Sequence, residues 1–177
     1  MDIDKKVWEV LCSEEEINQR ITEMGKQISE EYKGKNLYVI SLLKGSFVFT
    51  ADLVRKISIP VKIGFMTTSS YGHSDTSSGK VQMKADITDD LEEYDVMVVD
   101  DIVDSGITMN FVLEHLKSKN PKSLASCVLL DKPSRRQIFM EPDYVGFTIE
   151  DKFVVGYGLN YGDYYRNIPY VSAVTNE

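Results

Sequence analysis

The chain has 177 residues, of which 42% are hydrophobic and 27% charged, and its formal net charge is −8. This length and composition predict one folded domain with a full core, and they exclude a disordered chain. The acidic balance argues against a general nucleic-acid binder, which needs a basic surface, although it is compatible with a small basic pocket.

The chain carries no sign of a membrane segment or of a disulfide framework. No apolar run is long enough to cross a bilayer, and the first ten residues lack the apolar core of a signal peptide, so we expect a cytoplasmic protein without a membrane partner. Cys12 and Cys127 lie in apolar surroundings without metal-binding spacing, which predicts reduced core residues.

Helical and strand patterns alternate along the chain. Ser13 and Glu16 have capping-box spacing, and the isoleucines and methionine that follow at three- and four-residue intervals predict a helix that stops near Gly34. Further on we expect a strand at 37–43, a helix at 47–57, a strand at 60–69, an exposed mobile loop at 70–80, a strand at 96–100, a helix at 108–119, and strands at 123–130, 152–158 and 168–174. This alternation predicts an α/β fold with a mostly parallel sheet and helices on both faces.

The most informative stretch is VMVVDDIVDSGITM at 96–109. Two acids, Asp100 and Asp101, end an apolar run, and Asp104 precedes a loop of small residues that opens a helix. Free N–H groups at a helix start bind phosphate, and adjacent carboxylates bind sugar hydroxyls or Mg²⁺, so the stretch predicts a ribose 5-phosphate pocket. Ordinary helix capping explains the D-S-G-x-T tail equally well, but three repelling acids on one turn favour a ligand.

Three of the predicted strands end in chemically active pairs. Residues 44–45 (Lys-Gly), 100–101 (Asp-Asp) and 131–132 (Asp-Lys) each follow an apolar run. Ligands of parallel sheets bind beyond the carboxyl ends of the strands, so these pairs are expected to meet at one site.

Five segments, in order, resemble the type I phosphoribosyltransferases, and within them the bacterial hypoxanthine-guanine type. They are SLLKGSFVFTADLVR (41–55), SSYG (69–72), the acidic stretch at 96–109, LLDKPSRR (129–136) and FVVGYGLNYGDYYRNIPYV (153–171). A chance match to one short motif is common, whereas five in order are not expected by chance.

The resemblance implies a single phosphoribosyltransferase domain over 1–177. Its mostly parallel sheet would carry a small hood, formed by the N-terminal segment and about 131–177, and a mobile lid at about 69–82. The implied reaction is Mg²⁺-dependent transfer of phosphoribosyl from phosphoribosyl pyrophosphate to N9 of hypoxanthine, with guanine as the second expected base. The products would be IMP or GMP and pyrophosphate, and the resemblance implies a homodimer or homotetramer.

The resemblance assigns the acidic stretch to the sugar and its phosphate. Asp100 and Asp101 would hold the ribose hydroxyls and orient hydrated Mg²⁺. Asp104 would also move a proton at N7 of the purine as the catalytic residue, whereas its ordinary alternative is a helix N-cap. The residues around the 5-phosphate would be Asp104, Ser105, Gly106, Ile107 and Thr108.

Other segments would hold the pyrophosphate and the base. Leu43, Lys44, Gly45 and Arg166 resemble the pyrophosphate site, where the peptide before the lysine is cis. Lys132 would donate to the purine 6-oxo group and so reject adenine. The residues that would contact the ring are Ile102, Phe153 and Val154. Without the resemblance, solvated lysines, a surface ion pair for Arg166 and ordinary strand core for Phe153 explain these residues.

Ser70 and Tyr71 resemble the start of the family's lid, which closes to exclude water from a cation-like reaction centre. The alternative for this stretch is a disordered surface loop.

Three positions depart from the family pattern. Asp100 stands where glutamate is usual, and Ile107 stands where many relatives have a polar residue. Asn160 stands where relatives carry an aspartate near the purine 2-position and a second Mg²⁺. Because asparagine is neutral and a poorer ligand for a hard cation, we expect weaker second-metal binding and an altered preference for guanine.

Two other functions remain open at this stage. A transcription or RNA-attenuation regulator could be built on the same fold, but the acidic pI of about 4.9 and the presence of Lys132, Phe153 and Arg166 disfavour it. An enzyme for xanthine-guanine or adenine is the other alternative, and Lys132 argues only against adenine.

Overall fold

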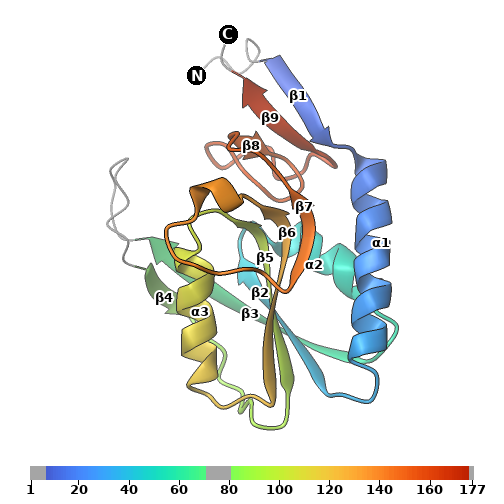
Figure 1. Ribbon diagram of the computed structural model, residues 1–177, viewed down its shortest axis with the longest axis vertical. Coiled ribbons are helices and arrows are strands. Elements are labelled where there is room, and N and C mark those ends of the chain that lie inside the picture. The colour runs from blue at the N-terminus through green and yellow to red at the C-terminus, as the bar shows by residue number, and fades with distance from the viewer. Residues whose placement is uncertain (1–6, 71–80, 176–177) are drawn as a thin grey trace.

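The computed structural model of the chain describes residues 7–70 and 81–175 (Figure 1). The elements, in chain order, are β1 (Val7–Cys12), α1 (Glu14–Glu31), β2 (Leu37–Leu43), α2 (Phe47–Val54), β3 (Val61–Ser70), β4 (Val81–Ala85), β5 (Asp95–Val103), α3 (Ile107–Lys117), β6 (Ser123–Asp131), a short 3-10 turn (Pro133–Arg135), β7 (Tyr144–Thr148), β8 (Val154–Val155) and β9 (Val171–Thr175). None of the described helices combines the length and apolar composition needed to cross a lipid bilayer.

The central sheet has six strands in the order β4-β3-β2-β5-β6-β7. Its neighbouring strands from β3 to β7 are parallel, and only β4 runs antiparallel, at the edge beside β3. The predicted mostly parallel α/β sheet is therefore confirmed.

Side chains of the central strands alternate between the two faces of the sheet, because successive residues of a strand point in opposite directions. On β5, Val96 and Val98 pack in a cluster that includes residues of α3, whereas Met97 and Val99 pack in a cluster with α1 and α2. Figure 1 shows α1 and α3 on opposite sides of the sheet. The expectation of helices on both faces is confirmed.

A second, antiparallel sheet joins the start and the end of the chain in the order β1-β9-β8. Trp8 of β1 pairs with Val174 of β9, and Val154 of β8 pairs with Ala173 of the same strand. This small sheet positions the segment after β8, which returns to the carboxyl ends of the parallel strands.

The first predicted helix has the expected N-terminus. The Ser13 hydroxyl accepts from the Glu16 backbone N–H at 3.2 Å, and a Glu16 carboxylate oxygen accepts from the Ser13 N–H at 2.8 Å. The Ser13 N–H and the Ser13 hydroxyl, which also donates to the Glu16 carboxylate at 2.7 Å, lower the pKa of Glu16. The helix ends at Glu31, three residues before Gly34, which has φ +77°.

Several strand boundaries differ from the sequence expectation. β5 continues to Val103 because its ladder with β6 reaches the pair Val103–Asp131, so Asp100 and Asp101 lie in a strand rather than in a turn. The strand expected at 152–158 is only β8, since Gly156, Tyr157 and Gly158 all have positive φ. The helix expected at 47–57 ends at Val54, and β1, β4 and β7 were not predicted.

The expected loop at 70–80 falls almost entirely outside the described residues. Ser70 is the last residue of β3, and Tyr71 lies in the part of the chain that the structure does not describe.

Candidate active site at the carboxyl ends of the parallel strands

The ends of β2 and β5 pack against each other through a glycine and a carboxylate. A Cβ atom on Gly45 would lie 1.7 Å from Oδ2 of Asp101, so any larger residue at this position would collide with the carboxylate. The segment after β8 packs on the other side of the same turn. A Cβ atom on Gly158, whose φ is +101°, would lie 2.1 Å from the carbonyl oxygen of Gly45. Three segments that are distant in sequence therefore pack closely against one another around Gly45.

Arg166 is attached to this junction. Its Nη1 donates to the carbonyl oxygen of Gly158 at 2.6 Å, and its positive charge acts on Asp101. The predicted pyrophosphate residues Gly45 and Arg166 are therefore close to the acidic pair. The peptide bond between Leu43 and Lys44 is cis, as the resemblance implied, and the Lys44 side chain is exposed.

Asp100 and Asp101 form a half-buried acidic pair. Burial, and next the charge of Asp101, raise the pKa of Asp100 well above its ordinary value, and burial also raises the pKa of Asp101. Among the described residues, no basic nitrogen lies within 4.0 Å of either carboxylate. Two half-buried carboxylates that repel each other are suited to a hard cation or to sugar hydroxyls.

The loop that starts α3 surrounds a small cavity of about 120 Å³. Gly106 is the N-cap residue with φ +82°, and the Ser105 hydroxyl accepts from the Ile107 N–H at 3.3 Å. Asp104 is therefore not the N-cap of α3, which was the ordinary structural interpretation of this residue. The cavity is lined by Asp100, Ile102, Val103, Asp104, Ser105, Gly106, Thr108 and Met109. Six of these were predicted site residues, and Val103 and Met109 were missed because they read as ordinary core.

The two arginines after β6 have different roles, which the sequence does not distinguish. Arg136 is only 15% exposed, and its guanidinium donates to the carbonyl oxygens of Val103 and Asp104 at 3.1 and 2.8 Å and pairs with Asp131. Arg135 is half exposed and pairs with Asp104 at 3.3 Å. Arg136 thus holds the backbone of the loop at 104–108, the candidate phosphate loop, whereas Arg135 engages the candidate catalytic carboxylate of Asp104.

The candidate base site lies between β6 and β8. Lys132 is 6% exposed, and its Nζ donates to the carbonyl oxygen of Lys152 at 2.5 Å, next to Phe153. Phe153 is 53% exposed and meets the ring of Tyr161 edge-on at 5.6 Å, while Val154 is buried in the small sheet. Because Lys132 is buried, it is not a solvated surface lysine, which was its alternative interpretation. Because Phe153 is exposed, it is not an ordinary strand-core residue.

Asn160 is half-buried and follows Leu159, whose N–H donates to the carbonyl oxygen of Gly156 at 3.0 Å. It therefore lies just beyond the tight turn that contains Gly158.

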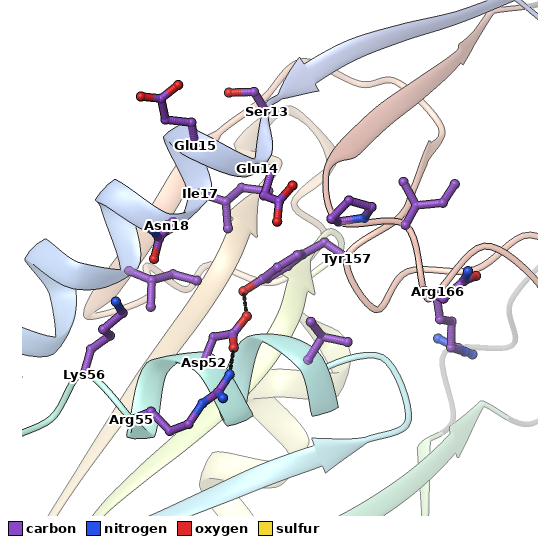
Figure 2. Close-up of a pocket in the computed structure, with 15 residues that line it drawn as sticks. Ser13, Glu14, Glu15, Ile17, Asn18, Asp52, Arg55, Lys56, Tyr157 and Arg166 are labelled. Atoms are coloured by element: carbon purple, nitrogen blue, oxygen red, sulfur yellow. Dashed lines mark hydrogen bonds and ion pairs between the residues drawn. The ribbon is translucent and has the colours of Figure 1, made fainter.

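A larger cavity of about 1040 Å³ lies behind this site, between α1, α2 and residues 157–169 (Figure 2). Its lining includes Arg166 and Tyr157, but none of the acidic pair, the phosphate loop or Lys132. No sequence motif predicts this cavity, because its walls come from three segments that are distant in sequence.

Comparison with known proteins identifies the family. The model of the phosphoribosyl transferase domain matches residues 8–162. The chain belongs to the phosphoribosyltransferase family. Among its phosphoribosyltransferase relatives, hypoxanthine phosphoribosyltransferase of Salmonella typhimurium is 47% identical over 172 residues, which are 96% of this chain and 97% of that protein. The enzyme of the same name from Escherichia coli is 45% identical with the same coverage.

Solved phosphoribosyltransferase structures show the same fold. A crystal structure of hypoxanthine phosphoribosyltransferase from Staphylococcus aureus superposes with a TM-score of 0.90 at 42% identity, covering 94% of this chain and 91% of that chain. A hypoxanthine-guanine phosphoribosyltransferase from Bacillus anthracis gives 0.87 at 41% identity, with coverages of 94% and 97%. The predicted type I phosphoribosyltransferase fold is thereby confirmed.

Proposed function

We propose that this protein is a purine-salvage enzyme that transfers the 5-phosphoribosyl group of phosphoribosyl pyrophosphate to N9 of hypoxanthine and of guanine. The observation that carries the proposal is the junction of Asp101, Gly45, Gly158 and Arg166 beside the loop that starts α3. The junction supports the proposal because acids suited to ribose hydroxyls lie close to a loop suited to phosphate and to a cation suited to pyrophosphate.

The reaction breaks the bond from C1 of the ribose to the pyrophosphate oxygen and forms the bond from C1 to N9 of the base. The loop at 104–108 holds the 5-phosphate, and Leu43, Lys44, Gly45 and Arg166 hold the pyrophosphate as it leaves. Asp104 moves the proton at N7 of the purine. Since Arg135 pairs with Asp104 in this structure, that pair opens when the base binds.

Lys132 and Phe153 select the base. The buried ammonium of Lys132 donates to the 6-oxo group in place of the Lys152 carbonyl, and an adenine amino group cannot accept that bond. Phe153 stacks on the purine, Ile102 contacts the opposite face, and Val154 contacts the ring edge through its backbone. Ser70 and Tyr71 begin a lid that excludes water from the reaction.

Steady-state assays with phosphoribosyl pyrophosphate and each of hypoxanthine, guanine, xanthine and adenine test this function. We expect turnover of hypoxanthine and guanine, and none of adenine. A preference for adenine would contradict the proposal. Absence of turnover with all four bases, together with salt-sensitive retention of RNA on filters, would support the regulatory alternative.

Mg²⁺ is the cofactor that we propose. Asp100 and Asp101 fit it, because two half-buried carboxylates that repel each other, with no basic partner among the described residues, supply hard oxygen ligands and gain from a cation. The described residues hold no cluster of three or more histidine, cysteine, aspartate or glutamate side chains, so the ion would keep water and substrate oxygens as its other ligands. When bound, it would neutralise charge on the pyrophosphate.

Asn160 is the residue through which we propose a weakened second Mg²⁺ site. Replacing Asn160 with Asp restores a charged oxygen ligand, so we expect the Mg²⁺ concentration for half-maximal activity to fall and the ratio of guanine to hypoxanthine turnover to change. Titration of the nucleotide-bound protein with Mn²⁺, followed by electron paramagnetic resonance, counts the bound ions directly. An Asn160→Asp variant with unchanged metal dependence and base preference would refute this role.

We further propose a cytoplasmic homodimer or homotetramer. Phe47 of α2 and Ile63 and Phe65 of β3 are large exposed apolar residues on the same face of the sheet, since Ile63 pairs with the inward-facing Val39. A second copy of the chain would cover such a patch. A solved Trypanosoma cruzi hypoxanthine phosphoribosyltransferase was studied for the role of its C-terminal region in oligomeric state and activity.

A further inference from the structure

Tyr157 holds an unusual position next to the candidate active site. It has φ +50°, a backbone conformation that favours glycine, yet its side chain is 5% exposed and packs in the core cluster with α1 and α2. Its hydroxyl donates to Oδ2 of Asp52 on α2 at 2.5 Å (Figure 2). Burial, and then this bond, raise the pKa of Tyr157, so the phenol stays a donor throughout the physiological pH range.

The partner carboxylate is held in place from the other side. Asp52 also pairs with Arg55, one turn further along α2, as Figure 2 shows. Each oxygen of Asp52 therefore has one partner, and Oδ2 is aimed at the phenol. The side chain of Asp52 is 32% exposed at the edge of the large cavity.

The turn that carries Tyr157 is tied to the pyrophosphate side of the site. The Tyr157 N–H donates to the Ile168 carbonyl at 2.8 Å, and the Gly158 N–H donates to the Arg166 carbonyl at 2.9 Å. Gly158 itself packs on the Gly45 carbonyl and accepts from the Arg166 guanidinium. A displacement of this turn would move Gly45 and Arg166, two of the residues that we propose to hold pyrophosphate.

The helix that carries Asp52 starts at the same place. α2 begins two residues after Gly45, and its N-cap Ser46 donates to the Leu42 carbonyl at 2.6 Å. The bond from Tyr157 to Asp52 thus links the turn at 156–159 to the helix that follows the pyrophosphate turn.

The base side of the site is fixed by separate contacts. Val154 pairs with Ala173 in the small sheet. The backbone N–H of Lys132 donates to the Val103 carbonyl at 2.9 Å. Neither contact involves Tyr157 or Asp52.

We propose that Tyr157 and Asp52 are a positioning pair for pyrophosphate: their hydrogen bond holds the turn at 156–159 and Arg166 against Gly45 without touching the substrate. This inference rests on the proposed function and extends it to two residues outside the substrate-binding set. It predicts a selective effect on the pyrophosphate side of the reaction.

The test removes the hydrogen bond and keeps the ring. For Tyr157→Phe we expect KM for phosphoribosyl pyrophosphate and the dissociation constant of Mg²⁺-pyrophosphate, measured by calorimetry, each to rise roughly three- to tenfold, the range of the net contribution of one typical hydrogen bond. KM for hypoxanthine should stay within a factor of two, on the order of experimental scatter in mutant series.

Two Asp52 variants test the same hydrogen bond independently, from the side of its acceptor. Asp52→Ala removes the acceptor, so, like Tyr157→Phe, it should raise KM for phosphoribosyl pyrophosphate but not KM for hypoxanthine. Asp52→Asn keeps an amide oxygen that can accept from the phenol, so both KM values should stay close to those of wild type. The double variant Tyr157→Phe/Asp52→Ala should be no worse than either single change, because both remove the same bond. If Tyr157→Phe does not fold, the comparison of Asp52→Ala with Asp52→Asn decides the question.

Tyr144→Phe is the matched control. Tyr144 is also buried and also donates to a carboxylate, that of Glu31, but it lies on β7. We expect a loss of thermal stability in this variant and no change in either KM. A rise in both substrates' KM for Tyr157→Phe, or no rise in either, would overturn the positioning role. An inactive wild-type protein would instead contradict the proposed function, and the two failures are therefore distinct.

Discussion

At the scale of single residues, the acids of the stretch at 96–109 differ in environment. Asp100 and Asp101 are half-buried and desolvation raises their pKa, whereas the Asp104 side chain is 44% exposed and paired with Arg135. Partial burial suits the first two to binding a cation and hydroxyls. Because the Asp104 side chain is partly exposed, a purine base that enters from solvent can reach its carboxylate.

Asp104→Asn tests the proton transfer. The amide keeps the size of the side chain but cannot take up the proton, so we expect kcat to fall by about 10²–10³ with little change in thermal stability. Steady-state kinetics with hypoxanthine measure the effect, and Arg135→Gln is a control that removes only the ion-pair partner. If Asp104→Asn turned over within a few-fold of wild type, Asp104 would not be the base.

Asp100→Asn tests the charge carried by the half-buried pair. Because the folded-state pKa of Asp100 is raised, the unliganded protein loses stability as pH rises from the ordinary carboxyl pKa of about 4 through the raised value. The asparagine does not ionise, so in EDTA at pH 8 the variant should melt roughly 2–8 °C higher than wild type, the shift that 1–2 kcal/mol gives in a domain of this size.

The difference in melting temperature between the two proteins should shrink as the pH falls toward and below about 4, where Asp100 becomes protonated in the unfolded state as well as in the folded state. Thermal unfolding at several pH values, followed by circular dichroism, measures it. A variant less stable than wild type at pH 8 would show that the ionised pair is favourable in the folded protein.

At the scale of elements, the segment after β6 supports the phosphate loop. The Gln137 and Ile138 N–H groups donate to the Ser105 carbonyl at 2.9 and 3.2 Å, and Arg136 binds two further carbonyls of the loop. The loop conformation is therefore imposed by a segment about 30 residues away in sequence.

Replacing Arg136 with Met keeps much of the buried stem but removes these donors. We expect KM for phosphoribosyl pyrophosphate to rise at least about tenfold, and stability to fall by about 3 kcal/mol, since Asp131 loses its buried partner. Urea unfolding and steady-state kinetics measure the two effects. Arg135→Met should leave stability within about 0.5 kcal/mol, because its ion pairs are exposed. Equal stability losses in both variants would contradict a special role for Arg136.

At the scale of the whole molecule, the sheet face beside α2 is incompletely covered. α2 packs against β2 and β5 and leaves Ile63 and Phe65 of β3 exposed. This is the surface on which we expect a second copy of the chain.

Phe65→Lys places a charge in that patch and should convert the oligomer to monomer at micromolar concentration, since burying an unpaired charge is costly. Sedimentation velocity of wild type and variant measures the change. Phe139→Lys is the control, because Phe139 is 91% exposed in a different part of the molecule. A monomeric wild type, or an oligomer unaffected by Phe65→Lys, would contradict the proposed interface.

Local sequence determined the elements whose signal is contained in one segment. The capping box set the start of α1, and the β-branched run at 96–99 made a strand buried on both faces. The order of strands and helices was enough to place the ends of β2, β5 and β6 at one edge, because parallel strands point the same way.

The tertiary structure decided what depends on neighbours distant in sequence. The partner strand β6 extends β5 past Asp100 and Asp101, and desolvation in that packed position, rather than residue type, raises their pKa. Likewise, Arg135 and Arg136 are identical in type and adjacent in sequence, yet only Arg136 faces the buried carbonyls of the phosphate loop. The desolvation of a side chain and the direction in which it points depend on the packed chain, so the sequence of one segment alone could not predict them.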